Sequence, residues 1–135
     1  MHKGHIDLGF AKVDTDRLRR CGHPEVIFCP GKTDGQIVHI IKAMRKAGQN
    51  VLATRATREQ FRAVKKAVPA AVYHEMARAI TLDVVPLPRQ TGCVAVVCAG
   101  TSDLPVAEEA ALTAERMGAK VDRITDVGVA GLHRL

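Results

Sequence analysis

The chain has 135 residues, enough for one ordinary domain or for a small domain with part of a second. Its composition, 47% hydrophobic and 25% charged, is that of a globular protein, and no apolar run approaches the roughly 20 residues of a membrane span. The net charge of +6 invites a nucleic-acid partner, but 3% aromatic residues leave few side chains for bases to stack on. We therefore predict neither a nucleic-acid nor a membrane partner.

The first residues, M-H-K-G-H-I-D-L, lack the apolar core of a secretory signal, which predicts a cytoplasmic location. The four cysteines have no C-x-x-C spacing, and the six histidines form no H-x-x-x-H pair. We predict no protein-bound metal, and we predict reduced, mostly buried thiols at Cys21, Cys29, Cys93 and Cys98.

Residues 1–24 show no sustained period and are predicted to form an extended arm with a short helical turn at 16–20. A strand is predicted at 25–29, E-V-I-F-C, followed by a turn at Pro30-Gly31. Thr33 or Asp34 is expected to begin a helix that ends at Gly48. Its inner face has the spacing i, i+3, i+4, i+7, at Ile37, Ile40, Ile41 and Met44.

A second strand is predicted at 50–54, and Thr57 with Gln60 predicts a capping box for a helix over 58–68. Short strands are expected at 72–75 and 79–85. Residues 1–85 are therefore predicted to be a small α/β domain with the order β-α-β-α-β.

Residues 86–92, P-L-P-R-Q-T-G, are predicted to be a linker, because two prolines and a glycine suit neither a helix nor a central strand. Past it, a strand at 94–98, a helix behind Pro105 and a strand at 121–125 form one βαβ unit. Residues 93–135 are expected to be the incomplete start of a second domain, because one crossover cannot bury both faces of a parallel sheet.

The junction A-G-T-S-D at 99–103 carries the chemistry that the residues themselves suggest. Gly100 allows close backbone approach, Ser102 or Asp103 can cap the helix, and the remaining N–H groups with the Thr101 and Ser102 hydroxyls suit a phosphate. A well-capped turn that binds nothing fits these residues equally well.

Two further segments resemble functional sites. Pro30-Gly31-Lys32-Thr33 is not a P-loop, because Val26 stands where that pattern requires glycine. His133 and Arg134 are expected beside the Gly100 loop, where they could move a proton and grip an anion. A solvated chain end explains the same pair.

Taken together, A-G-T-S-D-L-P-V-A-E-E-A and D-V-G-V-A-G-L-H-R-L resemble the PurE-type aminoimidazole ribonucleotide carboxylase domain and, more closely, its LarB relatives. The segments D-L-G-F-A-K-V-D, P-E-V-I-F-C-P-G-K-T, V-L-A-T-R-A-T and Y-H-E-M-A-R also look like LarB. The resemblance implies that 93–135 begins a PurE-like, flavodoxin-like three-layer domain with a parallel sheet, and it implies a homo-oligomer.

The resemblance also implies an activity. LarB-type proteins carboxylate the pyridinium ring of nicotinic acid adenine dinucleotide and cleave its phosphoanhydride, which releases AMP on the way to the nickel-pincer nucleotide. CO2 or bicarbonate is the co-substrate, no bound cofactor is implied by a clear motif, and Mg²⁺ could accompany the nucleotide. A cysteine thiolate is thought to add to the ring and to leave when the ring proton is lost.

By the same resemblance, Gly100, Thr101, Ser102 and Asp103 are expected to bind substrate, and His133 and Arg134 to be catalytic or phosphate-binding. The family's nucleophilic cysteine lies in a later segment, so this chain is expected to be an inactive fragment. Two alternatives stay open: an aminoimidazole ribonucleotide carboxylase of purine biosynthesis, and a module that binds a nucleotide or a partner without chemistry.

Overall fold

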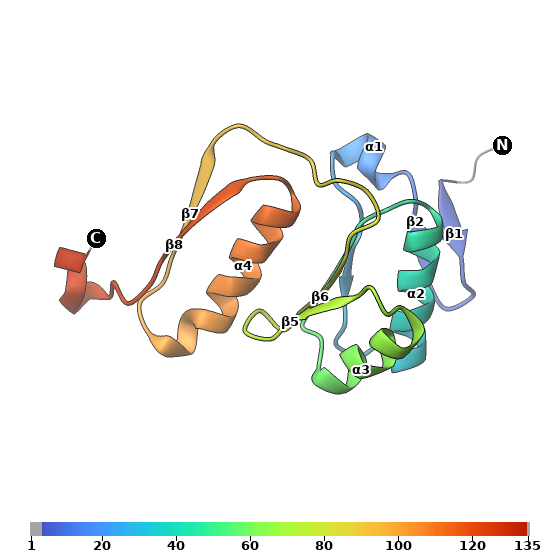
Figure 1. Ribbon diagram of the computed structural model, residues 1–135, viewed down its shortest axis with the longest axis horizontal. Helices are drawn as coiled ribbons and strands as arrows, with labels where there is room; N and C mark the ends of the chain where they lie inside the picture. The colour runs from blue at the N-terminus through green and yellow to red at the C-terminus, as the bar shows by residue number, and fades with distance from the viewer. Residues whose placement is uncertain (1–3, 135) are drawn as a thin grey trace. The chain divides into compact units, whose positions relative to one another are not determined.

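The computed structural model describes residues 4–134, which divide into two compact units (Figure 1). One unit holds residues 4–74 and 79–86, and the other holds residues 75–78 and 87–134. The chain is mixed α/β, as predicted, with parallel strands in both units. None of its described helices is long and apolar enough to cross a membrane.

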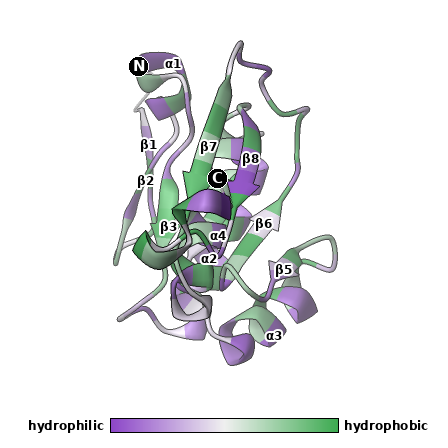
Figure 2. Cartoon of the chain, turned by 90° about the vertical axis from the view of Figure 1, so that its left-hand side faces the viewer, coloured by the Kyte–Doolittle hydropathy of each residue, from purple (hydrophilic) through white to green (hydrophobic). Residues whose placement is uncertain are grey.

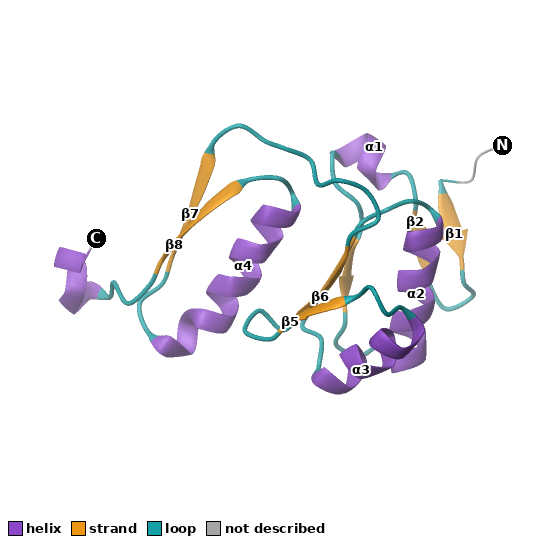
Figure 3. Cartoon of the chain, in the orientation of Figure 1, coloured by secondary structure: helices purple, strands orange, loops and turns teal. Residues whose placement is uncertain are grey.

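The first unit contains three helices and six strands (Figure 3). In chain order they are β1 (His5–Asp7), β2 (Lys12–Asp14), α1 (Arg17–Cys21), β3 (Val26–Phe28), α2 (Asp34–Lys46), β4 (Val51–Thr54), α3 (Arg58–Ala67), β5 (Val72–His74) and β6 (Ala79–Leu82). The main sheet has the order β3-β4-β6-β5, in which β3 and β4 are parallel and the other neighbours are antiparallel.

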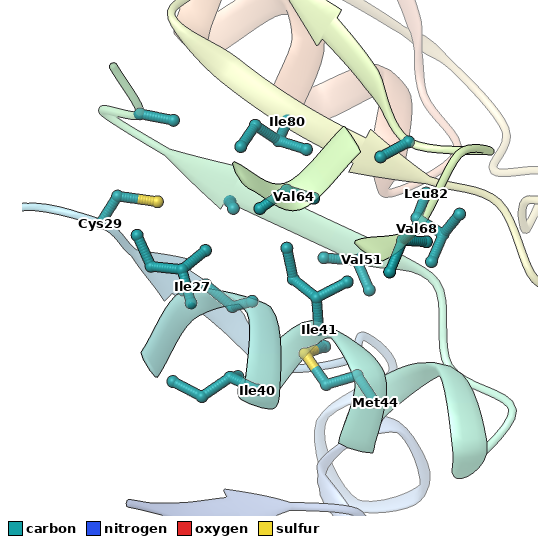
Figure 4. Close-up of a cluster of buried hydrophobic side chains, with 14 of the residues drawn as sticks. Ile27, Cys29, Ile40, Ile41, Met44, Val51, Val64, Val68, Ile80 and Leu82 are labelled. Atoms are coloured by element: carbon teal, nitrogen blue, oxygen red, sulfur yellow. The ribbon is translucent and has the colours of Figure 1, made fainter. Parts of the chain in front are cut away.

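The core lies on one face of this sheet. The register pairs Ala53 with Ile27 on one side and with Ile80 on the other, and Val51 with Leu82, so these side chains share a face. Helices α2 and α3 cover that face and contact each other (Figure 4). The helix residues in this core are Ile37, Ile40, Ile41, Ala43, Met44 and Val64.

Both helices begin where the sequence predicts them. Thr33 and Thr57 are the N-cap residues, and each forms a capping box with the glutamine three positions later. In the second box, the Gln60 N–H donates to the Thr57 hydroxyl at 3.1 Å, and the Thr57 N–H donates to Gln60 Oε1 at 2.9 Å. Two otherwise orphaned N–H groups are thereby satisfied at each helix start.

The first residues differ from the predicted extended arm, because β1 and β2 form an antiparallel hairpin. Ile6 pairs with Val13, whose side chain is 2% exposed in the core, and Leu8 is half-buried against that core. Gly9 takes a φ of +84° in the turn, a value that suits glycine. Strands of only three residues carry too few alternations to give a sustained period.

The second unit contains β7 (Cys93–Val97), the 3₁₀ turn η1 (Thr101–Asp103), α4 (Leu104–Arg116), β8 (Lys120–Ile124) and the 3₁₀ segment η2 (Val129–Arg134). β7 and β8 are parallel, with Val94 opposite Val121 and Ala95 opposite Asp122. This is the predicted βαβ unit.

α4 packs on one face of the β7–β8 pair and covers it in part, because Val94 on that face is still 43% exposed. The register places Val94, Val96, Val121 and Arg123 on one face, and Arg123 is bonded to Glu108 and Glu115 of α4. The other face carries Cys93, Ala95 and Val97, and all three are exposed although β7 is apolar along its length (Figure 2). A strand that is apolar on both faces is typical of a parallel sheet with helices on both sides, and one crossover helix cannot supply both.

Truncation of one core valine tests this description. Val51 is 1% exposed in β4, whereas Val72 is 51% exposed in β5, and both lie in strands. Val51→Ala is expected to lower the free energy of unfolding by about 2 kcal/mol, and Val72→Ala by less than about 1 kcal/mol. Urea unfolding followed by circular dichroism measures both, and equal losses would contradict the assigned core.

Candidate functional site

The candidate site lies where the chain leaves β7 and β8. These strands are parallel, so their carboxyl ends meet at the same edge of the sheet. Pairing continues past the strands, because the Cys98 N–H donates to the Ile124 carbonyl at 3.0 Å and the Val127 N–H donates to the Cys98 carbonyl at 3.3 Å. A Cβ built on Gly128 would lie 3.5 Å from Ala99 Cβ, so the two loops touch beside Gly100.

Gly100 opens a tight turn that its own neighbours close. The Asp103 N–H donates to the Gly100 carbonyl at 3.0 Å, and Asp103 Oδ2 accepts from the Gly100 N–H at 3.1 Å. Thr101 and Ser102 lie between them and are exposed to solvent. This turn holds both hydroxyls at the sheet edge.

Asp103 occupies the N-cap position of α4, but its carboxylate makes no capping bond to that helix. The sequence predicts that Ser102 or Asp103 caps the helix and that the remaining N–H groups of the turn are left for a phosphate. Instead the Asp103 carboxylate uses the Gly100 N–H and places negative charge beside it. The Thr101 and Ser102 hydroxyls are therefore the groups of this turn best suited to meet a ligand.

Arg134 folds back onto the loop that precedes it. Its Nη1 atom lies 2.9 Å from Asp126 Oδ2 and donates to the Asp126 carbonyl at 3.0 Å. A Cβ on Gly131 would lie 3.2 Å from Cζ of Arg134, so the guanidinium packs against a position without a side chain. Arg134 thus fastens residues 126–134, and His133 next to it is exposed.

Arg123 of β8 is bonded to two glutamates of α4. Its Nε donates to Glu108 at 2.9 Å, and its two terminal nitrogens donate to the Glu115 carboxylate at 2.6 and 3.2 Å. These bonds raise the pKa of the guanidinium, with the hydrogen bond to Glu115 as the largest cause. The helix that leads from the Gly100 turn is therefore tied to β8 by charge.

The four thiols are free, but only Cys29 is buried, so the predicted burial of most of them was wrong. Burial raises the pKa of Cys29 to about 11. Cys93 is exposed, and its pKa is also raised because its thiol donates to Asp122 Oδ2 at 3.3 Å. Neither thiol is suited to act as a thiolate near neutral pH.

The acidic partners of these groups could not be predicted from the sequence. Asp126 beside Arg134, Asp122 beside Cys93, and the two glutamates on Arg123 all depend on strand register or on a loop that turns back. The only sequence signal was the spacing of Glu108 and Glu115, which places both on one face of α4. Across residues 4–134, no three or more His, Cys, Asp or Glu side chains gather as metal ligands.

Comparison with known proteins gives two matches. The family model of the LarB/PurE-like N-terminal domain matches residues 5–84. The chain is also 35% identical over 139 aligned positions to uncharacterized protein MJ0165 of Methanocaldococcus jannaschii. That match covers 92% of this chain and 51% of the relative, so the chain spans about half the relative's length.

The raised pKa of Cys93 predicts how its reactivity will change on mutation. Asp122→Asn removes the carboxylate that disfavours the thiolate, so the pKa should fall and more thiolate should be present at pH 8. Alkylation of Cys93 by iodoacetamide should become roughly three to ten times faster, measured by peptide mass spectrometry. Exposed Cys21 in the same molecule is the internal control. An unchanged or slower rate at Cys93 alone would refute the assigned role of Asp122.

Proposed function

Because the chain belongs to the LarB family, we propose that it is part of a LarB-type enzyme that carboxylates the pyridinium ring of nicotinic acid adenine dinucleotide. The reaction would form a carbon–carbon bond between the ring and CO2 and would release the ring proton to a base. Water would then cleave the phosphoanhydride and liberate AMP. The observation that carries this proposal is the match of the LarB/PurE-like N-terminal domain model over residues 5–84.

The Gly100 turn supplies the binding groups of the proposed site. The exposed hydroxyls of Thr101 and Ser102 can donate to a phosphate of the dinucleotide, and Gly100 lets the backbone approach it. Asp103 can accept hydrogen bonds from a ribose, because its second carboxylate oxygen is not the one that binds Gly100. In this arrangement the Thr101 and Ser102 hydroxyls bind the charged phosphate, and the Asp103 carboxylate binds the neutral ribose.

His133 and Arg134 have different roles in this proposal. His133 is exposed on the loop that approaches Ala99 at Gly128, and its imidazole can accept the ring proton. Arg134 is engaged by Asp126, so it would reach a phosphate only by exchanging that carboxylate for the ligand. We therefore assign His133 to proton transfer and Arg134 to holding the loop.

The nucleophilic thiolate is proposed to lie outside these 135 residues. The pKa values of Cys29 and Cys93 are raised, the first by burial and the second by its hydrogen bond to Asp122. Cys98 is half-buried beside the Gly100 turn. We also propose that the complete protein is a cytoplasmic homo-oligomer, in which Mg²⁺ could accompany the nucleotide.

A turnover assay on the product of the complete reading frame tests the activity. Nicotinic acid adenine dinucleotide and ¹³C-bicarbonate should yield a labelled carboxylated mononucleotide and AMP, both detected by mass spectrometry. Residues 1–135 alone should yield neither. Carboxylation of aminoimidazole ribonucleotide instead would move the assignment to the purine-type enzyme, and binding with no turnover by the complete product would favour the binding module.

A pair of threonine substitutions tests the turn itself. Thr101→Val should weaken binding of the dinucleotide about threefold to tenfold, because it removes one hydroxyl donor to a charged phosphate. Thr91→Val makes the same change at another exposed position and should leave binding unchanged. Calorimetric titration measures both variants. Equal affinities for Thr101→Val and the unmodified chain would remove Thr101 from the site.

A further inference from the structure

A groove of about 530 Å³ runs between β1 and α2 in the first unit. Its apolar lining comes from Ile6 and Leu8 of the hairpin and from Ala43 and Ala47 at the end of α2. Its polar lining comes from three side chains of α2, His39, Lys42 and Lys46. The groove therefore combines an apolar floor with cationic groups.

The groove follows from how the hairpin packs. The core face of α2 carries Ile37, Ile41 and Met44, whereas the groove residues recur on a neighbouring face of the same helix. The β1–β2 hairpin lies over that second face (Figure 1), and Val13 anchors it in the core. Small side chains at positions 43 and 47 leave the space that the hairpin encloses.

Two features of the rim limit what the groove can hold. Lys42 and Lys46 are four residues apart on one helix face, where like charges repel, so an anion between them would relieve that repulsion. His39 Nδ1 lies 2.6 Å from the Gly35 carbonyl and must carry the proton to donate to it, which leaves Nε2 for another partner. Phe10 contacts the imidazole edge-on, with centroids 6.4 Å apart, and supports the ring at the rim.

We propose that this groove binds a nucleoside monophosphate. A phosphate monoester carries close to two negative charges near neutral pH, which matches two lysines better than a single carboxylate does. The base would lie on Ala43 and Ala47 against Ile6 and Leu8, with its edge toward His39. The volume falls within the range of small-molecule sites and is far larger than inorganic phosphate requires.

This site goes beyond the proposed carboxylase function and does not depend on it. None of its residues belongs to the Gly100 turn or to residues 126–134. The two proposals can therefore fail separately. If Thr101→Val leaves AMP binding unchanged and substitution of Lys42 and Lys46 weakens it, AMP binds in the groove.

The test is calorimetric titration of the 135-residue chain with AMP at physiological salt. AMP should bind with a stoichiometry near one, and adenosine and inorganic phosphate should each bind at least tenfold more weakly. Lys42→Gln with Lys46→Gln should weaken AMP binding at least tenfold. Arg62→Gln with Lys66→Gln makes the same charge change at the same spacing on an exposed part of α3 and should have less than a twofold effect.

A second variant tests the apolar lining of the groove and leaves the net charge unchanged. Ala47→Phe places a ring in the groove and should abolish AMP binding, while the far-ultraviolet circular dichroism stays that of the unmodified chain. Absence of AMP binding, equal binding of inorganic phosphate, or equal losses in the α2 and α3 double variants would each overturn the proposal. The last result would show a general attraction of anions to a basic protein.

Discussion

A parallel pair of strands cannot be closed by a tight turn, so each parallel pairing in this chain needs a helix to carry the chain back. α2 performs that role between β3 and β4, and α4 performs it between β7 and β8. The same constraint brings the loops that leave β7 and β8 to one sheet edge. Ala99 and Gly128 become neighbours for this reason, although a whole helix separates them in sequence.

The two crossovers differ in what holds their helices. Beneath α2 and α3, side chains such as Ile37, Ile41 and Met44 are fully buried, and burial of this kind supplies most of the free energy of folding. In α4, the buried residues are Ala111 and Leu112, and Arg123 of β8 binds two glutamates of that helix at a partly exposed site. Such ion pairs contribute little in water and are weakened by salt. Burial of apolar side chains therefore stabilises the first unit more than the second.

The sequence predicted most of the elements because their signals are local. The capping box at Thr57, the apolar stripe of α2 and the βαβ order of the second unit all depend on residues a few positions apart. Prediction from the sequence failed where contacting residues are far apart in the chain or where a strand has only three residues. The β1–β2 hairpin has three residues in each strand, and the carboxylates beside Arg134 and Cys93 are set by a returning loop and by strand register. No periodicity in the chain encodes those contacts.

The β1–β2 hairpin, which the sequence did not predict, changes the surroundings of the α2 lysines. By sequence they belong to an exposed basic helix face, and such a face attracts every anion within a screening length of about 8 Å at physiological salt. The hairpin adds Ile6 and Leu8 opposite Ala43, so an anion held by Lys42 and Lys46 also meets apolar surface that bare phosphate cannot use. Charge alone sets how often anions arrive, whereas the apolar wall decides which of them stay. The selectivity of this face of α2 thus depends on the β1–β2 hairpin.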